Sequence, residues 1–252
     1  MSQPGRRIHL PPAQLATAAA GLLPLTPAQQ KYLGAVLRLH PGDPVEAFDG
    51  GGATWRSTLE AGPDGALALR LGPRTEAANT GALDVWLAQA LVKADKFELV
   101  LQKATELGAS RVLPFAAARS VVKLDDERGS AKVERWRKIA QEAARQCGRA
   151  DVPAVDKPQR LGELLEIAGR VPDRRGLVLD AGERPLRLSA AARGAGKLLL
   201  VVGPEGGLAP EELAACEAAG LLGVSLGPLV LRTETAGLAA LSVVQHLAGA
   251  LG

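Results

Sequence analysis

Leu198–Gly207 reads LLLVVGPEGG, and Leu226–Ala236, a little further along the chain, reads LGPLVLRTETA. Each segment places a glycine-rich turn after a short apolar run, which is the pattern of a strand that ends in a tight loop. Glycine leaves the peptide N–H and C=O groups of such a loop open to close approach by a small ligand. The second segment then carries the polar run Arg232–Thr235 into the start of a C-terminal helix. The two segments together predict a ligand site built from successive loops of one domain.

The chain from residue 82 onward alternates short apolar runs with amphipathic segments. Strand–helix alternation is typical of an α/β domain with a mainly parallel sheet, whose buried strands are short and apolar. The predicted strands cover residues 83–90, 111–114, 177–179, 198–202 and 224–226. The predicted helices cover residues 132–147, 211–219 and 235–251, and a segment between Asp95, as an N-cap paired with Glu98, and Gly108, which ends it.

The first 72 residues have a different pattern. Short β-type segments at 45–48, 54–59 and 66–71 are separated by turns rich in Gly, Pro and Asp. Short strands at this spacing predict a small β-barrel. Residues 73–81 lack apolar periodicity and are the predicted linker, which gives a first domain over 1–72 and a second over 82–252.

Composition indicates an ordinary globular protein, with 47% hydrophobic and 23% charged residues and a net charge of +3. Aromatic residues are only 3%, which argues against a base-stacking surface for RNA. No apolar run is long enough for a transmembrane helix, and the N-terminus lacks an apolar signal core, so a cytoplasmic protein is expected. Cys147 and Cys216 are the only cysteines, and they predict reduced thiols rather than a zinc site or a disulfide.

Nucleotide-binding motifs do not explain the glycine-rich segments. Gly203–Gly207 lacks the GxGxxG spacing of a dinucleotide site. GAGK at Gly194–Lys197 has Ala191 where a P-loop needs its first glycine, and Leu198 where it needs Ser or Thr. A simple turn leading into a helix is the remaining alternative for GPEGG, and a helix cap is the alternative for Thr233 to Thr235.

With several further segments, these residues resemble the SPOUT class of methyltransferases, and more narrowly its RsmE family. The further segments are Leu37–Gly50, Lys93–Gly108, Arg119–Asp125 and Gln141–Arg149. The resemblance implies methylation of N3 of a uridine in 16S ribosomal RNA, with S-adenosyl-L-methionine as the methyl donor and no metal. It also implies a SPOUT-type parallel sheet with a C-terminal trefoil knot over roughly 175–252, a PUA-like N-terminal barrel that binds RNA, and a homodimer.

The donor's flat adenine and its cationic sulfonium fit the loops described above. Apolar side chains would enclose the adenine while glycine backbone groups bond its edge, as in most small-ligand pockets. Loops at the carboxyl ends of parallel strands are also where α/β sheets bind ligands. The predicted donor-binding residues are Leu179, Gly203, Glu205, Gly206, Gly207, Leu226, Gly227, Val230, Leu231, Thr233, Thr235 and Ala236.

Arg232 is the first candidate for a catalytic residue. An arginine is unfavourable at the positive end of a helix, so capping does not explain Arg232, whereas a phosphate or a developing uracil anion beside it would. Glu205 and Glu234 are candidate general bases, although an ordinary carboxylate is a weak base for N3. Loss of the proton to water is the alternative.

Cationic side chains recur along the first two predicted helices of the second domain and near the N-terminus, as RNA phosphates require. For each helix alone, a solvated polar face is the alternative. The predicted RNA-binding residues are Arg7, Arg38, Lys93, Lys96, Lys103, Arg119, Lys123, Arg145, Gln146 and Arg149. Ala150 stands where the family often has Asn, so this chain lacks whatever that amide contributes.

Two other functions compete with this interpretation. Another SPOUT enzyme, for example one acting on the ribose 2′-OH, would carry Asn and Ser in place of RTETA. A non-catalytic ribosome-assembly factor would bind RNA without needing a methyl-donor pocket.

Overall fold

The computed structural model describes residues 6–62, 65–76, 83–120, 126–182 and 184–252. The chain forms two compact units. The first contains residues 1–79 and 144–152, and the second contains residues 80–143 and 153–252. No helix of the described residues is long and apolar enough to cross a membrane.

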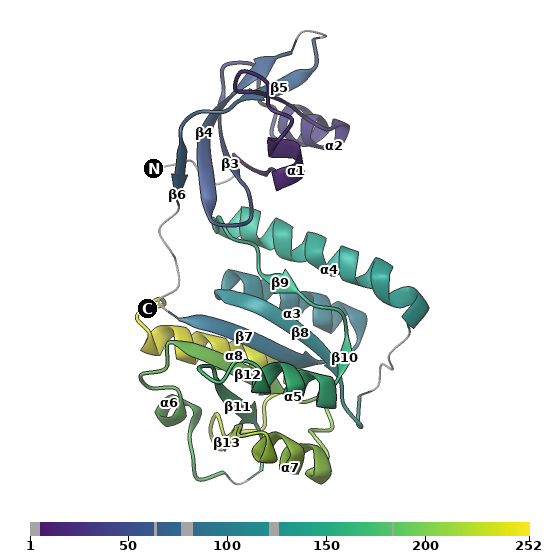
Figure 1. Cartoon of the computed structure of the whole chain (residues 1–252), viewed down its shortest axis with the longest axis vertical. Coiled ribbons are helices and arrows are strands. Elements are labelled where there is room, and N and C mark those ends of the chain that lie inside the picture. Colours follow the sequence, from purple (N-terminus) through teal and green to yellow (C-terminus); the bar gives the residue numbers. More distant parts are fainter. Residues whose placement is uncertain (1–5, 63–64, 77–82, 121–125, 183) are drawn as a thin grey trace. The chain divides into compact units, whose positions relative to one another are not determined.

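The second unit is built on one sheet of seven parallel strands (Figure 1). Its strands are β7 (Asp84–Ala90), β8 (Ala109–Ala116), β9 (Ala154–Val155), β10 (Gln159–Arg160), β11 (Arg175–Leu179), β12 (Lys197–Val202) and β13 (Leu222–Val224). The order across the sheet is β10-β8-β7-β12-β11-β13, and β9 also pairs with β8. Every pairing is parallel, so the carboxyl ends of β11, β12 and β13 meet at one edge.

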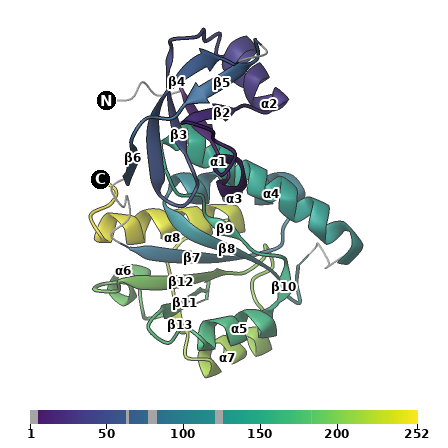
Figure 2. The same ribbon diagram turned by 45° about the horizontal axis from the view of Figure 1, so that its top comes forward.

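Helices cover both faces of this sheet. They are α3 (Ala94–Glu106), α4 (Asp126–Cys147), α5 (Leu161–Gly169), α6 (Leu188–Ala191), α7 (Pro210–Ala218) and α8 (Thr233–Leu247). Figures 1 and 2 show α3 and α8 on one face and α5 and α7 on the other. This two-sided cover explains why the strands are apolar at consecutive positions.

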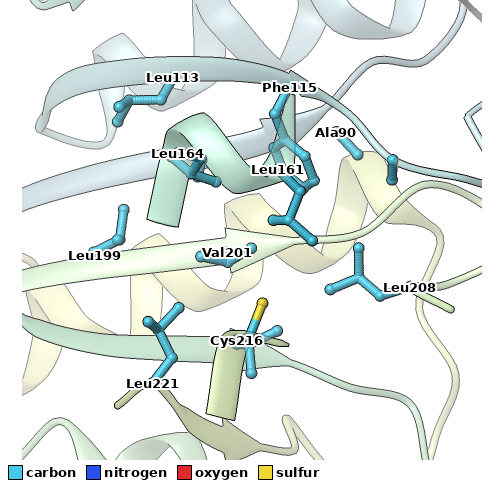
Figure 3. Close-up of a cluster of buried hydrophobic side chains, with 13 residues drawn as sticks. Ala90, Leu113, Phe115, Leu161, Leu164, Leu199, Val201, Leu208, Cys216 and Leu221 are labelled. Atoms are coloured by element: carbon cyan, nitrogen blue, oxygen red, sulfur yellow. The ribbon is translucent and has the colours of Figure 1, made fainter. Parts of the chain in front are cut away.

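Alternate residues of β12 supply both layers of the core. Leu199 and Val201 belong to the cluster that packs against α5 and α7, where Leu164 and Cys216 are buried (Figure 3). On the other face, a Cβ added to Gly237 of α8 would lie 3.6 Å from the Leu87 and Val202 side chains. The glycine therefore lets the first turns of α8 lie close against β7 and β12.

The first unit holds a sheet of six strands, which is mainly antiparallel. Its order is β1-β3-β4-β5-β2, and β6 pairs with β4. The strands are β1 (Arg7–His9), β2 (Leu22–Pro24), β3 (Pro44–Phe48), β4 (Ala53–Ala61), β5 (Leu67–Arg70) and β6 (Arg74–Glu76). Two short helices, α1 (Pro12–Leu15) and α2 (Pro27–Gln30), and a π-helix, η1 (Lys31–Val36), complete it. Leu23, Leu33, Leu59 and Leu69 form the centre of its core.

Part of the predicted linker is a strand. β5 pairs with only the end of β4, from Thr58 to Ala61, so the start of β4 has open backbone groups on that side. The strand β6, residues 74–76, pairs with these open groups at Ala53 to Trp55 of β4. The strand was not apparent from the sequence because all three of its side chains are exposed.

Several predicted boundaries also shift. Asp95 is not the N-cap of α3: Lys93 occupies that position, and Asp95 lies in the first turn, where its charge still favours the helix dipole. Gly108 follows the helix end with φ +86°, as expected of a glycine that ends a helix. α8 begins at Thr233 rather than Thr235, and β13 ends at Val224 rather than residue 226.

Residues 144–152 pack with the first unit, although the sequence analysis placed them in the second domain. Backbone hydrogen bonds tie this segment to the loop between β3 and β4: Gly52 N donates to Ala150 O (3.2 Å), and Val152 N donates to Gly50 O (2.9 Å). Arg7 adds a buried side chain that donates to carbonyls of the same segment, including Arg149 O at 3.0 Å. These contacts join residues about a hundred positions apart or more, which no local pattern reveals.

Candidate active site

A pocket lies at the carboxyl ends of β11, β12 and β13, formed by the loops that leave these strands. It is lined by Leu179, Asp180, Ala181, Val202, Gly203, Pro204, Glu205, Gly207, Leu208, Leu226, Gly227, Leu229, Val230, Leu231, Thr233 and Ala236. Of the predicted donor-binding residues, only Gly206 and Thr235 do not line it. The two glycine-rich segments, Leu198–Gly207 and Leu226–Ala236, therefore meet in one cavity.

Thr233 joins the two loops from inside. Its side chain is buried, and its hydroxyl donates to Gly203 O at 2.5 Å while it accepts from Gln89 Nε2 at 2.9 Å. This chain of hydrogen bonds runs from the end of β7, through the first residue of α8, to the GPEGG loop. Thr233 consequently shapes the pocket wall as well as lining it.

The glycines of the GPEGG loop have distinct tasks. Gly207 has φ +70°, a left-handed conformation that L side chains rarely adopt. A Cβ on Gly203 would lie 3.0 Å from Leu208 N, so a larger residue there would displace the loop backbone. Outside the loop, Arg119 donates from Nη1 to Gly206 O at 2.9 Å. Arg119, a predicted RNA-binding residue, therefore also supports the loop.

The two candidate bases share one cation. Lys96 Nζ lies 3.4 Å from Glu205 Oε1 and 3.3 Å from Glu234 Oε1. The hydrogen bond to Glu234, reinforced by the one to Glu205, raises the pKa of Lys96 above 10.5. Sequence reasoning predicted Lys96 as a phosphate ligand, whereas here its ammonium is bound to two carboxylates.

Arg232 occupies the N-cap position of α8 (φ −61°, ψ 149°) and its side chain does not cap the helix. The backbone begins the helix, because Arg232 O accepts from Thr235 N at 2.9 Å and Ala236 N at 2.8 Å. The exposed guanidinium has no hydrogen bond or ion pair to any residue that the structure describes. It is thus a cation beside the pocket whose donors are open to an added group.

Six residues that line the pocket were not predicted from the sequence: Asp180, Ala181, Val202, Pro204, Leu208 and Leu229. Asp180 follows β11 and accepts from Arg184 Nε at 2.8 Å. Partial burial acts to raise the pKa of Asp180, but the hydrogen bonds from Arg184 and from the Gly182 backbone, together with the charge of Arg184, outweigh it and lower the pKa below its usual value. Leu229 stands beside Val230 in the second motif, and both side chains are about three-quarters exposed, at 76% and 77%. Asp180 directly follows an apolar predicted strand, and this position could have indicated a residue at the ligand-binding edge of the sheet.

The predicted RNA-binding residues fall into separate groups. Arg38, Lys93 and Gln146 are exposed. Lys103 pairs with Glu106 at 2.9 Å, and the Arg145 guanidinium lies 4.5 Å from the centre of the Tyr32 ring. Lys123 lies outside the described residues.

Arg7 and Arg149 differ from the rest because both are buried, at 4% and 7% exposure. Arg7 pairs with Glu46 at 2.6 Å, and Arg149 pairs with Asp151 at 2.5 Å. These contacts give both arginines a structural task within the first unit, which a pattern of charges along the sequence could not distinguish from a phosphate contact.

No group of three or more His, Cys, Asp or Glu side chains among the described residues is placed to hold a metal ion. Within the described chain, the chemistry-bearing groups near the pocket are thus the carboxylates, Lys96, Arg119 and Arg232.

Comparison with known proteins identifies the family. A family model described as an RNA methyltransferase domain matches residues 79–245, and one described as an RNA methyltransferase PUA domain matches residues 25–71. The Mycobacterium tuberculosis protein named ribosomal RNA small subunit methyltransferase E is 40% identical over 222 residues, covering 84% of this chain and 82% of the relative.

Solved structures agree over nearly the whole chain. A Legionella pneumophila structure, described as a methyltransferase in complex with bound SAM, superposes with a TM-score of 0.84 at 31% identity, covering 96% of this chain and 97% of the other. A ribosomal RNA small subunit methyltransferase E from Neisseria gonorrhoeae, bound to S-adenosyl methionine, gives a TM-score of 0.83 at 28% identity with the same coverage. The chain therefore belongs to the family of ribosomal RNA small subunit methyltransferase E, the RsmE family that its motifs resemble.

Proposed function

We propose that this protein methylates N3 of a uridine in 16S ribosomal RNA and uses S-adenosyl-L-methionine as the methyl donor. The observation that carries the proposal is the pocket at the ends of β11, β12 and β13, with Arg232 beside it. The Legionella and Neisseria structures, which hold this molecule, support the choice of donor. An RNA substrate of the small ribosomal subunit would place the activity in the cytoplasm, where ribosomes assemble.

The residues of the pocket fit this donor. Leu179, Leu226 and Leu231 supply apolar surface for an adenine ring. Gly203 and Gly207 supply backbone without side chains, so peptide groups can reach the edge of the ring. When bound, S-adenosylmethionine supplies a methyl group on a sulfonium, which is electrophilic enough to be attacked directly. The protein's own task is then to position the uracil and to stabilise its anion.

Arg232 is suited to that stabilisation. Loss of the N3 proton spreads negative charge over O2 and O4 of uracil, and a planar guanidinium can donate two hydrogen bonds to such a group. Its donors are unused by the described residues. Glu205 lines the pocket and remains the candidate base, with Glu234 as the second candidate and water as the other proton acceptor.

RNA binding is proposed to use the exposed cations of both units, Arg38 and Lys93 among them, together with Gln146, Lys103, Arg119, Lys123 and Arg145. The PUA domain match supports an RNA-binding task for the first unit. We also propose a trefoil knot over roughly 175–252 and a homodimer formed through the second unit. Apolar side chains exposed on that unit, including Leu229 and Leu247, support the homodimer.

Product analysis tests the function. The purified protein is incubated with labelled S-adenosylmethionine and either naked 16S RNA or small subunits from cells that lack this modification. The RNA is then digested to nucleosides for mass analysis. N3-methyluridine is the expected product. A 2′-O-methyl nucleoside would replace this proposal with a different SPOUT activity, and RNA binding without any methylated product would indicate an assembly factor.

A further inference from the structure

Lys96 connects three segments of the second unit that are far apart in the sequence. It lies in the first turn of α3, while Glu205 belongs to the GPEGG loop and Glu234 to the first turn of α8. Its ammonium is 3.4 Å from one carboxylate and 3.3 Å from the other. The two loops that form the pocket are therefore tied together by an ion pair as well as by Thr233.

The Lys96 ammonium compensates the negative charge of a largely buried carboxylate, that of Glu234. The Glu234 side chain is only 13% exposed, and its Oε2 is buried with no hydrogen-bond partner among the described residues. A carboxylate in that setting is costly unless a cation compensates it. Glu205 places a second negative charge on the same cation, so loss of Lys96 would leave two like charges facing each other.

The carboxylates of Glu205 and Glu234 lie where they would affect the binding of both substrates. Glu205 lines the pocket that would hold the methyl donor, and a polyanionic RNA would have to approach the same edge of the sheet. Uncompensated carboxylates there would repel both RNA phosphate and a developing uracil anion. Lys96 is held by two carboxylates, in contrast to Lys93, whose exposed side chain belongs to the N-cap residue of the same helix.

We infer that Lys96 is a positioning residue of the methyl-transfer site: it holds the GPEGG loop against the start of α8 and neutralises Glu205 and Glu234. This inference rests on the function proposed above. A lysine ammonium is charged across the neutral range at its ordinary pKa, and the hydrogen bond to Glu234 raises the pKa of Lys96 further. The competing role is a direct contact between Lys96 and an RNA phosphate.

Lys96→Met and the matched variant Lys93→Met separate these roles. S-adenosylmethionine affinity is measured by calorimetry, and RNA affinity is measured over a range of salt concentrations. If Lys96 positions the loops, Lys96→Met weakens donor affinity about three- to tenfold, the range expected for two partly exposed ion pairs. The salt slope of RNA binding stays at the wild-type value. Lys93→Met, which removes a proposed RNA contact, lowers the salt slope by about one unit and leaves donor affinity unchanged.

A phosphate contact gives the opposite result. Lys96→Met would then lower the salt slope by about one unit and leave donor affinity at the wild-type value. That outcome overturns the inference. If wild-type protein itself fails to bind S-adenosylmethionine, the proposed function fails instead, so the two failures are distinguishable.

A double-mutant cycle between Lys96→Met and Glu234→Gln checks that the two residues act through each other. Coupled residues give a double variant whose loss of donor affinity is clearly smaller than the product of the two single losses. Independent, multiplicative losses would contradict the inference. Lys96→Arg keeps the charge and should retain most of the affinity. Should Lys96→Met not fold, Lys96→Gln and Glu234→Gln provide the same cycle.

Discussion

Arg232 and Lys96 are two cations near one pocket, and their surroundings separate their roles. Lys96 is bound by Glu205 and Glu234, whereas Arg232 has no ion pair to any described residue. The sequence could indicate Arg232 as a candidate functional residue, because a cation at the positive end of a helix is locally unfavourable and capping does not explain it. It could not predict the task of Lys96, because its partners lie 109 and 138 positions away and a charge pattern does not reveal a partner.

Replacing Arg232 should slow the chemical step. Removal of one group that stabilises a developing anion typically costs on the order of 100-fold in rate. Arg232→Ala is therefore expected to lower the single-turnover methylation rate by about that factor, with little loss of S-adenosylmethionine affinity. Arg232→Lys should recover only part of the rate, because lysine lacks the planar fork.

Arg193→Ala is the matched control, because Arg193 is an exposed arginine of the same unit that does not line the pocket. Its rate should equal that of the wild type. Normal single-turnover rates for Arg232→Ala at saturating RNA would remove Arg232 from the chemical step.

At the scale of elements, an ion pair secures the amino ends of the central strands, opposite the pocket. Arg174 Nη1 donates to Asp84 O at 2.8 Å and to Leu198 O at 3.2 Å, so it ties β7 to β12. Its guanidinium also pairs with the Asp84 carboxylate and lies 3.9 Å from the centre of the Trp86 ring. The strands themselves follow from their apolar residues, but this tie depends on the strand order, which apolar runs do not specify.

Asp84→Asn should reduce stability in a pH-dependent way. Burial acts to raise the pKa of Asp84, but hydrogen bonds from Arg174 and Ser110 outweigh it, so the folded pKa lies below 3.8. A carboxylate with a lowered pKa stabilises the fold fully above its unfolded pKa, and this contribution is lost as the pH falls through the folded value. The loss for Asp84→Asn at pH 7 should be about 1–2 kcal/mol, because Arg174 is buried but the carboxylate is partly exposed.

Urea unfolding of wild type and variant at pH 7, and again below pH 3.8, measures this difference. The two proteins should converge in acid. Asp173→Asn is the control, since Asp173 pairs with Lys197 where both side chains are about half exposed or more, at 62% and 48%. That variant should resemble the wild type. An Asp84→Asn loss that persists undiminished in acid would show that the carboxylate charge is not its cause.

For the molecule as a whole, the sequence predicted the parallel α/β sheet, the N-terminal β unit and most of the pocket lining. The two fold predictions are confirmed, because apolar periodicity and turn residues are local features. The donor-binding role of the residues that line the pocket stays a prediction. The assignment of residues 144–152 to the first unit was not predictable, because it depends on Arg7 and on backbone pairing across a long stretch of chain. The same limit applies to Arg149, which reads as one member of a basic stripe but is buried against Asp151.

The second unit is expected to form the contact between two copies of the chain. The second unit exposes Leu247 at the end of α8, as well as Leu229 and Val230, which line the pocket. Exposed apolar groups of this kind are typical of surfaces that another protein covers, and a second copy of the chain can cover them symmetrically. Light scattering at micromolar concentration should therefore give twice the 26.1 kDa mass of the chain.

Leu247→Glu would place a charge in that interface, and we expect it to raise the dissociation constant at least about tenfold. Val36→Glu is the control, because Val36 is an equally apolar, exposed residue of the first unit, and it should leave the dimer intact. A wild-type monomer at these concentrations, or equal dissociation of both variants, would contradict a dimer formed through the second unit.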